Sequence, residues 1–227
     1  MVIGTNSYLH VANYNPNSLV KLENALTTLE KDVIIMEDLD LISLTNNMII
    51  KIGFMLLAKE YLRKNKKRRN NHIIGTYHIF NFIYDTKAFL DAVSMLLNQY
   101  YRLGYSKGNI DLKKESFLNS LNKKSPKLKN EIEKHHAWIK EVILWRESVI
   151  HRLSPIILTG TYDKKGKFKE LFHMPTLPKP FFDLESLTNS RKPVYQEILI
   201  FCENWINHAK KIFEVTCDTI AVELEQK

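Results

Sequence analysis

This sequence contains, five residues apart, an arginine that could bind an anion and a histidine that could transfer a proton. They are Arg146 and His151, in the run HHAWIKEVILWRESVIHRLSP that spans residues 135–155. If this run is a helix, at about 100° per residue, Arg146 projects between two apolar rows and His151 lies about 140° further round. The rows consist of Trp138, Val142, Trp145, Val149 and Leu153, and of Ile139, Ile143 and Ile150. An unpaired buried guanidinium is costly, so we expect an acidic side chain or an anionic ligand to meet Arg146.

The carboxylate best suited to meet Arg146 comes from an earlier segment. Residues 73–103 predict a helix whose apolar stripe includes Phe82 and Phe89 and also carries Asp85. Two helices would then each place one charge on an apolar face, and the two charges are opposite. We therefore predict that Asp85 and Arg146 contact each other, directly or through one water. Such a contact could be a purely structural ion pair, or Asp85 could support a functional arginine.

A dense cluster of cations follows the second predicted helix. It consists of Lys64, Lys66, Lys67, Arg68 and Arg69. One interpretation is a solvated connector with cations near a helix C-terminus, and the other is a patch that contacts the phosphates of a nucleic acid. The formal net charge of the chain, +8, is compatible with affinity for polyanions and equally with an ordinary basic protein.

Metal and cofactor chemistry has no recognisable motif in this sequence. The patterns GxxxxGK[ST], GxGxxG, HExxH, CxxC and GxSxG do not occur. The adjacent His135 and His136 would point about 100° apart on a helix, so we interpret them as a surface pair near a helix start. We predict no metal and no cofactor. His151 is then the side chain that the motif singles out for proton transfer near neutral pH.

The elements that must position these residues are mostly helices. Apolar periodicity predicts helices near residues 19–29, 40–63, 73–103, 112–121 and 194–224, and a central helix that begins at Ser125 and Pro126 and carries Arg146. Residues 156–180 predict a hairpin around Asp163-Lys164-Lys165-Gly166. We therefore expect an all-α, up-and-down helical bundle with a small β-hairpin insertion after the motif helix. Residues 1–72 would be a helical extension packed on a 73–227 domain, in one compact unit.

The stretch Arg146-Glu147-Ser148-Val149-Ile150-His151 resembles the Arg-x4–6-His motif of the HEPN superfamily of helical domains. The resemblance covers residues 73–227, with Tyr84–Ala92 similar to the first core helix of that family. It implies a metal-independent endoribonuclease of toxin or phage-defence type, with RNA as substrate and a cognate antitoxin protein as a partner. It also implies catalytic roles for Arg146 on the phosphate and for His151 as acid or base, and a phosphate contact for Arg152.

A homodimer follows from the same resemblance and from the spacing. Arg146 and His151 diverge too far on one helix to form a compact site, whereas two helices crossing at a twofold axis could assemble one. The second apolar row, Ile139, Ile143 and Ile150, widens the apolar face beyond what one partner helix needs, which favours an interface there.

The sequence departs from the family pattern at one position and leaves an alternative open. The residue after the motif arginine is Glu147, whose carboxylate would repel a phosphate unless it is paired or turned away. The alternative is a non-catalytic all-α module that binds nucleic acid, nucleotide or protein, in which Arg146 is structural.

The spacing of the two cysteines, Cys202 and Cys217, indicates whether the protein works in a reducing or an oxidising compartment. They fall in one predicted helix about 22 Å apart, beyond disulfide reach, so we expect buried thiols in a reducing environment. No signal-peptide pattern is present and no uninterrupted apolar run approaches 18 residues. We therefore expect a cytoplasmic protein without membrane association.

Overall fold

The fold is an all-α bundle with a small antiparallel sheet, as the sequence predicts. The computed structural model describes residues 17–29, 36–65, 72–151, 158–162, 165–175 and 195–226. The helices in these ranges are α2 (Asn17–Leu29), α3 (Met36–Asn65), α4 (His72–Tyr100), α5 (Glu115–Lys124), α6 (Pro126–Glu133), α7 (His136–His151) and α9 (Ile198–Glu225), with a short 3₁₀ turn at Lys107–Asn109.

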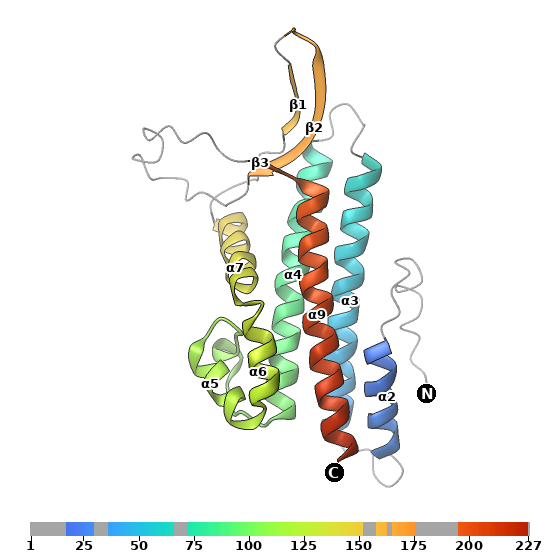
Figure 1. The fold of residues 1–227 in the computed structure, drawn as a ribbon, viewed down its shortest axis with the longest axis vertical. Helices are drawn as coiled ribbons and strands as arrows, with labels where there is room; N and C mark the ends of the chain where they lie inside the picture. Colours follow the sequence, from blue (N-terminus) through green and yellow to red (C-terminus); the bar gives the residue numbers. More distant parts are fainter. Residues whose placement is uncertain are drawn as a thin grey trace.

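The three longest helices form the centre of the molecule. Helices α3, α4 and α9 pack along one another, α2 lies against α9, and α7 lies against α4 (Figure 1). Helices α3 and α7 run toward one end of the bundle, and α4 and α9 run back from it, which is the expected up-and-down arrangement. One continuous apolar core joins the helices, and its fully buried members include Met48, Ile52, Phe82, Phe89, Phe117 and Phe213.

The segment predicted as an N-terminal extension contributes to that core. Helix α3 buries Met48, Ile49, Ile52 and Met55 completely. By length and composition its residues Asp40–Asn65 also meet the requirements of a membrane span, a test that the core helices of water-soluble proteins pass too. In this fold its apolar face packs against α4 and α9.

The predicted central helix is in fact two helices. Ser125 and Pro126 begin α6 as expected, but α6 ends at Glu133 and a turn separates it from α7, with the His135 N–H bonded to the Ile132 carbonyl at 3.0 Å. In one continuous helix the buried Leu128 and Ile132 would face about 90° away from the Trp138 stripe. The turn removes this mismatch, so both apolar stripes reach the core.

The predicted hairpin is present and gains a third strand. Strands β1 (Leu158–Tyr162) and β2 (Phe168–Pro175) are antiparallel, and between them Gly166 adopts the positive φ of 73° that glycine tolerates best. Strand β3 (Tyr195–Glu197) pairs with β2 and leads directly into α9. The last helix therefore begins at Ile198 rather than at Val194, because hydrogen bonds to β2 hold the preceding residues extended.

Candidate functional site

Helix α7 positions the motif arginine through its buried tryptophan face. Trp138, Val142 and Trp145 are buried in the core. Ile139 and Ile143 of the second apolar row are almost inaccessible too, and the side chain of Ile150 lies outside the described atoms. Arg146 is half-buried between the two rows, and His151 is the last residue of α7, with its side chain outside the described atoms. Burial of Ile139 and Ile143 within their own chain removes the two described members of the apolar row on which the predicted dimer interface rested.

Asp85 has Lys51 as its partner, and the predicted direct contact with Arg146 is absent among the residues that the structure describes. Lys51 Nζ of α3 donates to Asp85 Oδ1 at 3.1 Å, and both side chains are partly buried. Burial raises the pKa of Asp85, and Lys51 opposes that rise. The partner lies on α3 because Asp85 sits at the edge of the α4 face that α3 covers. One signal could have found it: Lys51 is the single charged residue between Leu41 and Ala58.

Arg146 is therefore left without a carboxylate. Within the described part of the chain it makes no hydrogen bond and no ion pair. The neighbouring Glu147 is exposed on the outward face of α7, about 100° round the helix from Arg146. A half-buried guanidinium in this setting retains its donors for an anion from solution.

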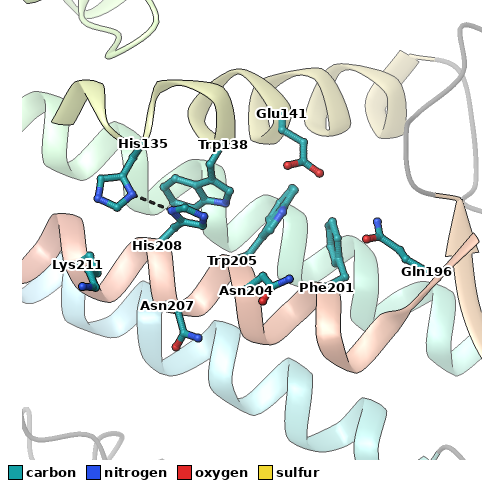
Figure 2. Close-up of a pocket in the computed structure, with 10 residues that line it drawn as sticks. All are labelled: His135, Trp138, Glu141, Gln196, Phe201, Asn204, Trp205, Asn207, His208 and Lys211. Carbon is teal, nitrogen blue, oxygen red and sulfur yellow. Dashed lines mark hydrogen bonds between the residues drawn. The ribbon is translucent and has the colours of Figure 1, made fainter. Parts of the chain in front are cut away.

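A groove of about 360 Å³ runs between α7 and α9 (Figure 2). Its floor consists of the buried rings of Trp138, Phe201 and Trp205. The polar lining residues are His135, Glu141, Gln196, Asn204, Asn207, His208 and Lys211. Motif reasoning did not predict this groove, because its residues come from two segments about 70 positions apart.

Two histidines close one end of the groove. His135 Nδ1 and His208 Nδ1 lie 2.7 Å apart, so one ring donates its N–H and the other accepts it. The His208 ring also stacks on Trp138, with ring centroids 5.2 Å apart and planes 13° from parallel. Burial lowers the pKa of both histidines, and the nearby His208 and Lys211 lower that of His135 further. His135 is thus a half-buried member of a pair and not the surface residue that adjacency to His136 suggested.

Glu141 is the acidic group of the groove. Burial raises the pKa of its carboxyl, while the indoles of Trp205 and Trp145 act in the opposite direction. Trp145 approaches the carboxylate without a hydrogen bond of standard geometry. Across the described ranges, no group of three or more His, Cys, Asp or Glu side chains is arranged to hold a metal ion.

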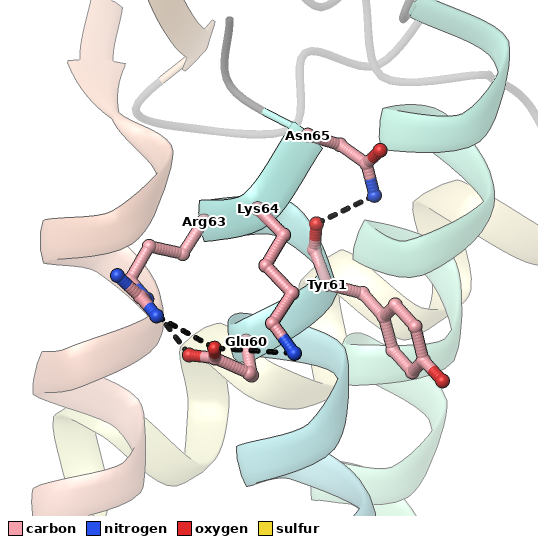
Figure 3. Close-up of polar contacts among 5 residues, drawn as sticks. All are labelled: Glu60, Tyr61, Arg63, Lys64 and Asn65. Atoms are coloured by element: carbon pink, nitrogen blue, oxygen red, sulfur yellow. Dashed lines mark hydrogen bonds and ion pairs between the residues drawn. The ribbon is translucent and has the colours of Figure 1, made fainter. Parts of the chain in front are cut away.

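Of the cations predicted to contact phosphate, the structure describes Lys64, which lies beside Glu60 and Arg63 near the end of α3 (Figure 3). Arg63 makes two hydrogen bonds to the Glu60 carboxylate, at 2.8 and 2.7 Å. Lys64 lies 3.7 Å from the same carboxylate and remains mostly exposed. The other predicted contacts, Lys66, Lys67, Arg68, Arg69 and Arg152, fall outside the described residues.

Comparison with protein-family models, with curated proteins and with solved structures finds no match to this chain. The case for any function therefore rests on the residues and their geometry.

Proposed function

We propose that this protein is a HEPN-like, metal-independent endoribonuclease in which Arg146 and His151 carry the chemistry. The observation that supports it most is the half-buried Arg146, which makes no ion pair with any described residue. A structural arginine at such a position would be expected to meet a carboxylate, and the obvious candidate, Asp85, is paired with Lys51. Among the described residues no carboxylate compensates the charge, which leaves the guanidinium able to bind an anionic substrate.

In the proposed reaction Arg146 binds the scissile phosphate and stabilises the charge that develops on it. His151 removes the proton from the ribose 2′-hydroxyl, whose oxygen then attacks the adjacent phosphorus. The bond from phosphorus to the 5′-oxygen breaks, and that oxygen takes a proton from the imidazolium of His151. The products are a 2′,3′-cyclic phosphate and a 5′-hydroxyl, and no redox partner is required.

The site needs two copies of the chain. Residues 146 and 151 point about 140° apart on one helix, so one phosphate cannot meet both side chains of a single α7. In a homodimer the arginine of one protomer could act with the histidine of its partner. The proposed interface lies at the C-terminal end of α7, because Arg146 points about 160° from the exposed Leu144 and an interface on the Leu144 face alone would leave the arginine out. A cognate antitoxin protein that covers this end of α7 would inhibit cleavage.

Cleavage of labelled RNA by the purified full chain tests the proposal. We expect cleavage that persists in EDTA and is lost in both Arg146→Ala and His151→Ala. Because Arg146 makes no ion pair with a described residue, Arg146→Ala should fold normally, as circular dichroism would check. Lys127→Ala, which removes an exposed cation of α6, is the matched control and should cleave as the wild type does. A folded His151→Ala protein that still cleaves RNA would refute the proposed chemistry.

The second candidate is a non-catalytic RNA-binding module. Glu147 favours it, because this exposed carboxylate directly follows the motif arginine and would disfavour a phosphate nearby. In that case the wild type would bind RNA without cleaving it, and Glu147→Asn would raise RNA affinity without producing cleavage.

A further inference from the structure

We infer that the end of the α3–α4 pair is a binding surface for single-stranded RNA, on which aromatic rings of both helices stack with unpaired bases. This inference rests on the proposed function, which names RNA as the substrate, and adds that the bound RNA is single-stranded. We call the surface the α3–α4 tip and define it by Tyr61, Arg63, Lys64, Ile73, Tyr77 and His78.

Three aromatic rings meet across the two helices at this tip. Tyr61 of α3 stacks on His78 of α4, with ring centroids 4.9 Å apart and planes 3° from parallel. Tyr77 meets the edge of His78, at 5.3 Å and 71°. Burial lowers the pKa of His78, so near neutral pH this ring takes part in the stack as an uncharged aromatic group.

The outer rings of this group are available to a ligand. Tyr61 is 50% exposed and Tyr77 is 61% exposed, although tyrosines usually bury much of their rings in a fold of this size. The face of Tyr61 that His78 does not cover can extend the existing stack by one base. Each ring offers a flat surface that any of the four bases could use, because stacking depends little on base identity.

Charge complementarity favours a nucleic acid as the occupant. By sequence, residues 59–72 contain seven Lys and Arg and one Glu, a net charge of +6 within a chain of formal charge +8. Of these cations the structure describes Lys59, Arg63 and Lys64, and the other four fall outside the described residues. Glu60, the one carboxylate in this stretch, is held by Arg63 in a bidentate pair, which lowers its pKa and screens it from an approaching phosphate (Figure 3). Cations next to exposed aromatic rings are the combination that binds the backbone and the bases of a single strand.

The position of the tip also suits the proposed chemistry. Helix α7 runs toward the same end of the bundle at which α3 ends and α4 begins (Figure 1). RNA held at the tip could therefore extend toward the C-terminal end of α7, where the proposed catalytic residues lie. A duplex would not gain from the rings, because its bases are already stacked inside the helix.

The test measures binding of fluorescent 15-nucleotide poly(U) by anisotropy, in a His151→Ala background that prevents cleavage. We expect Tyr61→Ala and Tyr77→Ala each to weaken binding by about five- to a hundredfold, and Tyr61→Trp to retain it. Tyr84→Ala is the matched control: this tyrosine is 41% exposed on α4, two turns from Tyr77 and away from the cations, and its removal should change nothing. Lys64→Gln should reduce the salt dependence of binding without altering the effect of the rings.

Binding of an RNA duplex and of lipid vesicles is compared with binding of poly(U). A 15-base-pair RNA duplex should bind more weakly than poly(U) and should not respond to the tyrosine variants. Vesicles of phosphatidylcholine with phosphatidylserine should not bind, and binding to them with the same tyrosine dependence would overturn the inference in favour of a membrane surface. Poly(U) affinity unchanged in folded Tyr61→Ala and Tyr77→Ala proteins would overturn it too. If the tyrosines matter for binding but the wild type never cleaves, the inference stands and the proposed nuclease activity fails.

Discussion

Removing the cation of the Lys51–Asp85 pair should destabilise the protein through the carboxylate left behind. Lys51→Met keeps the length and the apolar stem of the side chain while deleting the ammonium group 3.1 Å from Asp85 Oδ1. Burial already raises the pKa of Asp85, and Lys51 is the group that limits the rise. Without Lys51 the charged carboxylate would remain partly buried with no cation beside it.

The size of the effect follows from the burial of the two side chains. They are 30% and 18% exposed, which lies between a surface pair and a fully buried one. Breaking a surface pair costs at most about 1 kcal/mol, and removing one partner of a buried pair costs about 3–5 kcal/mol. We expect Lys51→Met to lower the free energy of unfolding at pH 7 by about 2 kcal/mol. For a chain of this length that corresponds to a fall in Tm of about 4–8 °C.

The pH dependence gives a second readout with a defined sign. Because the pKa of Asp85 in the folded state lies above the ordinary 3.8, the folded protein binds this proton more tightly than the unfolded chain does. The stability contributed by this group is therefore highest in acid and falls as the pH rises from 3.8 through the folded-state pKa. In Lys51→Met the folded-state pKa of Asp85 rises further. The difference in free energy of unfolding between Lys51→Met and the wild type should therefore shrink as the pH is lowered toward about 4.

Urea denaturation at several pH values measures these effects. Lys87→Met is the matched control, because it breaks the Lys87–Asp91 pair on α4, the helix that also carries Asp85. Asp91 is 48% exposed, so this change should cost less than about 0.5 kcal/mol. Asp85→Asn added to Lys51→Met should recover most of the loss, since no charge then remains at the site. Equal losses in Lys51→Met and Lys87→Met, or no recovery on adding Asp85→Asn, would refute the reasoning.

Three further predictions concern the core and the histidine pair. Cys202 and Cys217 are buried and their thiol pKa values are raised by burial, so Ellman's reagent should label neither in the native protein and both after denaturation; rapid native labelling would contradict this. His135 and His208 have lowered pKa values in the folded state, so their contribution to stability should be lost as the pH falls below the ordinary 6.5, and His208→Phe should flatten the decline in Tm between pH 7.5 and 5.5. Phe82→Ala deletes a fully buried ring and should cost about 3–5 kcal/mol in urea unfolding, whereas a loss below about 1 kcal/mol would show that the core does not pack around it.

The groove between α7 and α9 illustrates why the candidate site was only partly predictable. Arg146 and His151 could be singled out because both lie in one helix, where spacing alone fixes their relative direction. The pairing of His135 with His208 spans 73 positions in the sequence, so no local pattern connects them. Likewise, the exposed tyrosines Tyr61 and Tyr77 look like ordinary helix residues until α3 and α4 are placed side by side.

The sequence by itself determined which segments are helical and which face of each is buried. Apolar periodicity is a local property, and a stripe such as Phe82, Phe89 and Val93 must be buried whatever covers it. Gly166 marked the hairpin turn for an equally local reason, its tolerance of positive φ.

The tertiary structure alone decided which faces meet. Asp85 could have met any cation whose helix covers that edge of α4, and the packing of α3 gave it Lys51 instead of Arg146. The same holds for β3, which is extended because β2 supplies its hydrogen bonds, and for the turn at His135, which brings two mismatched apolar stripes onto one core. Each of these outcomes depends on distances between residues far apart in the chain, and periodicity within one segment carries no information about those distances.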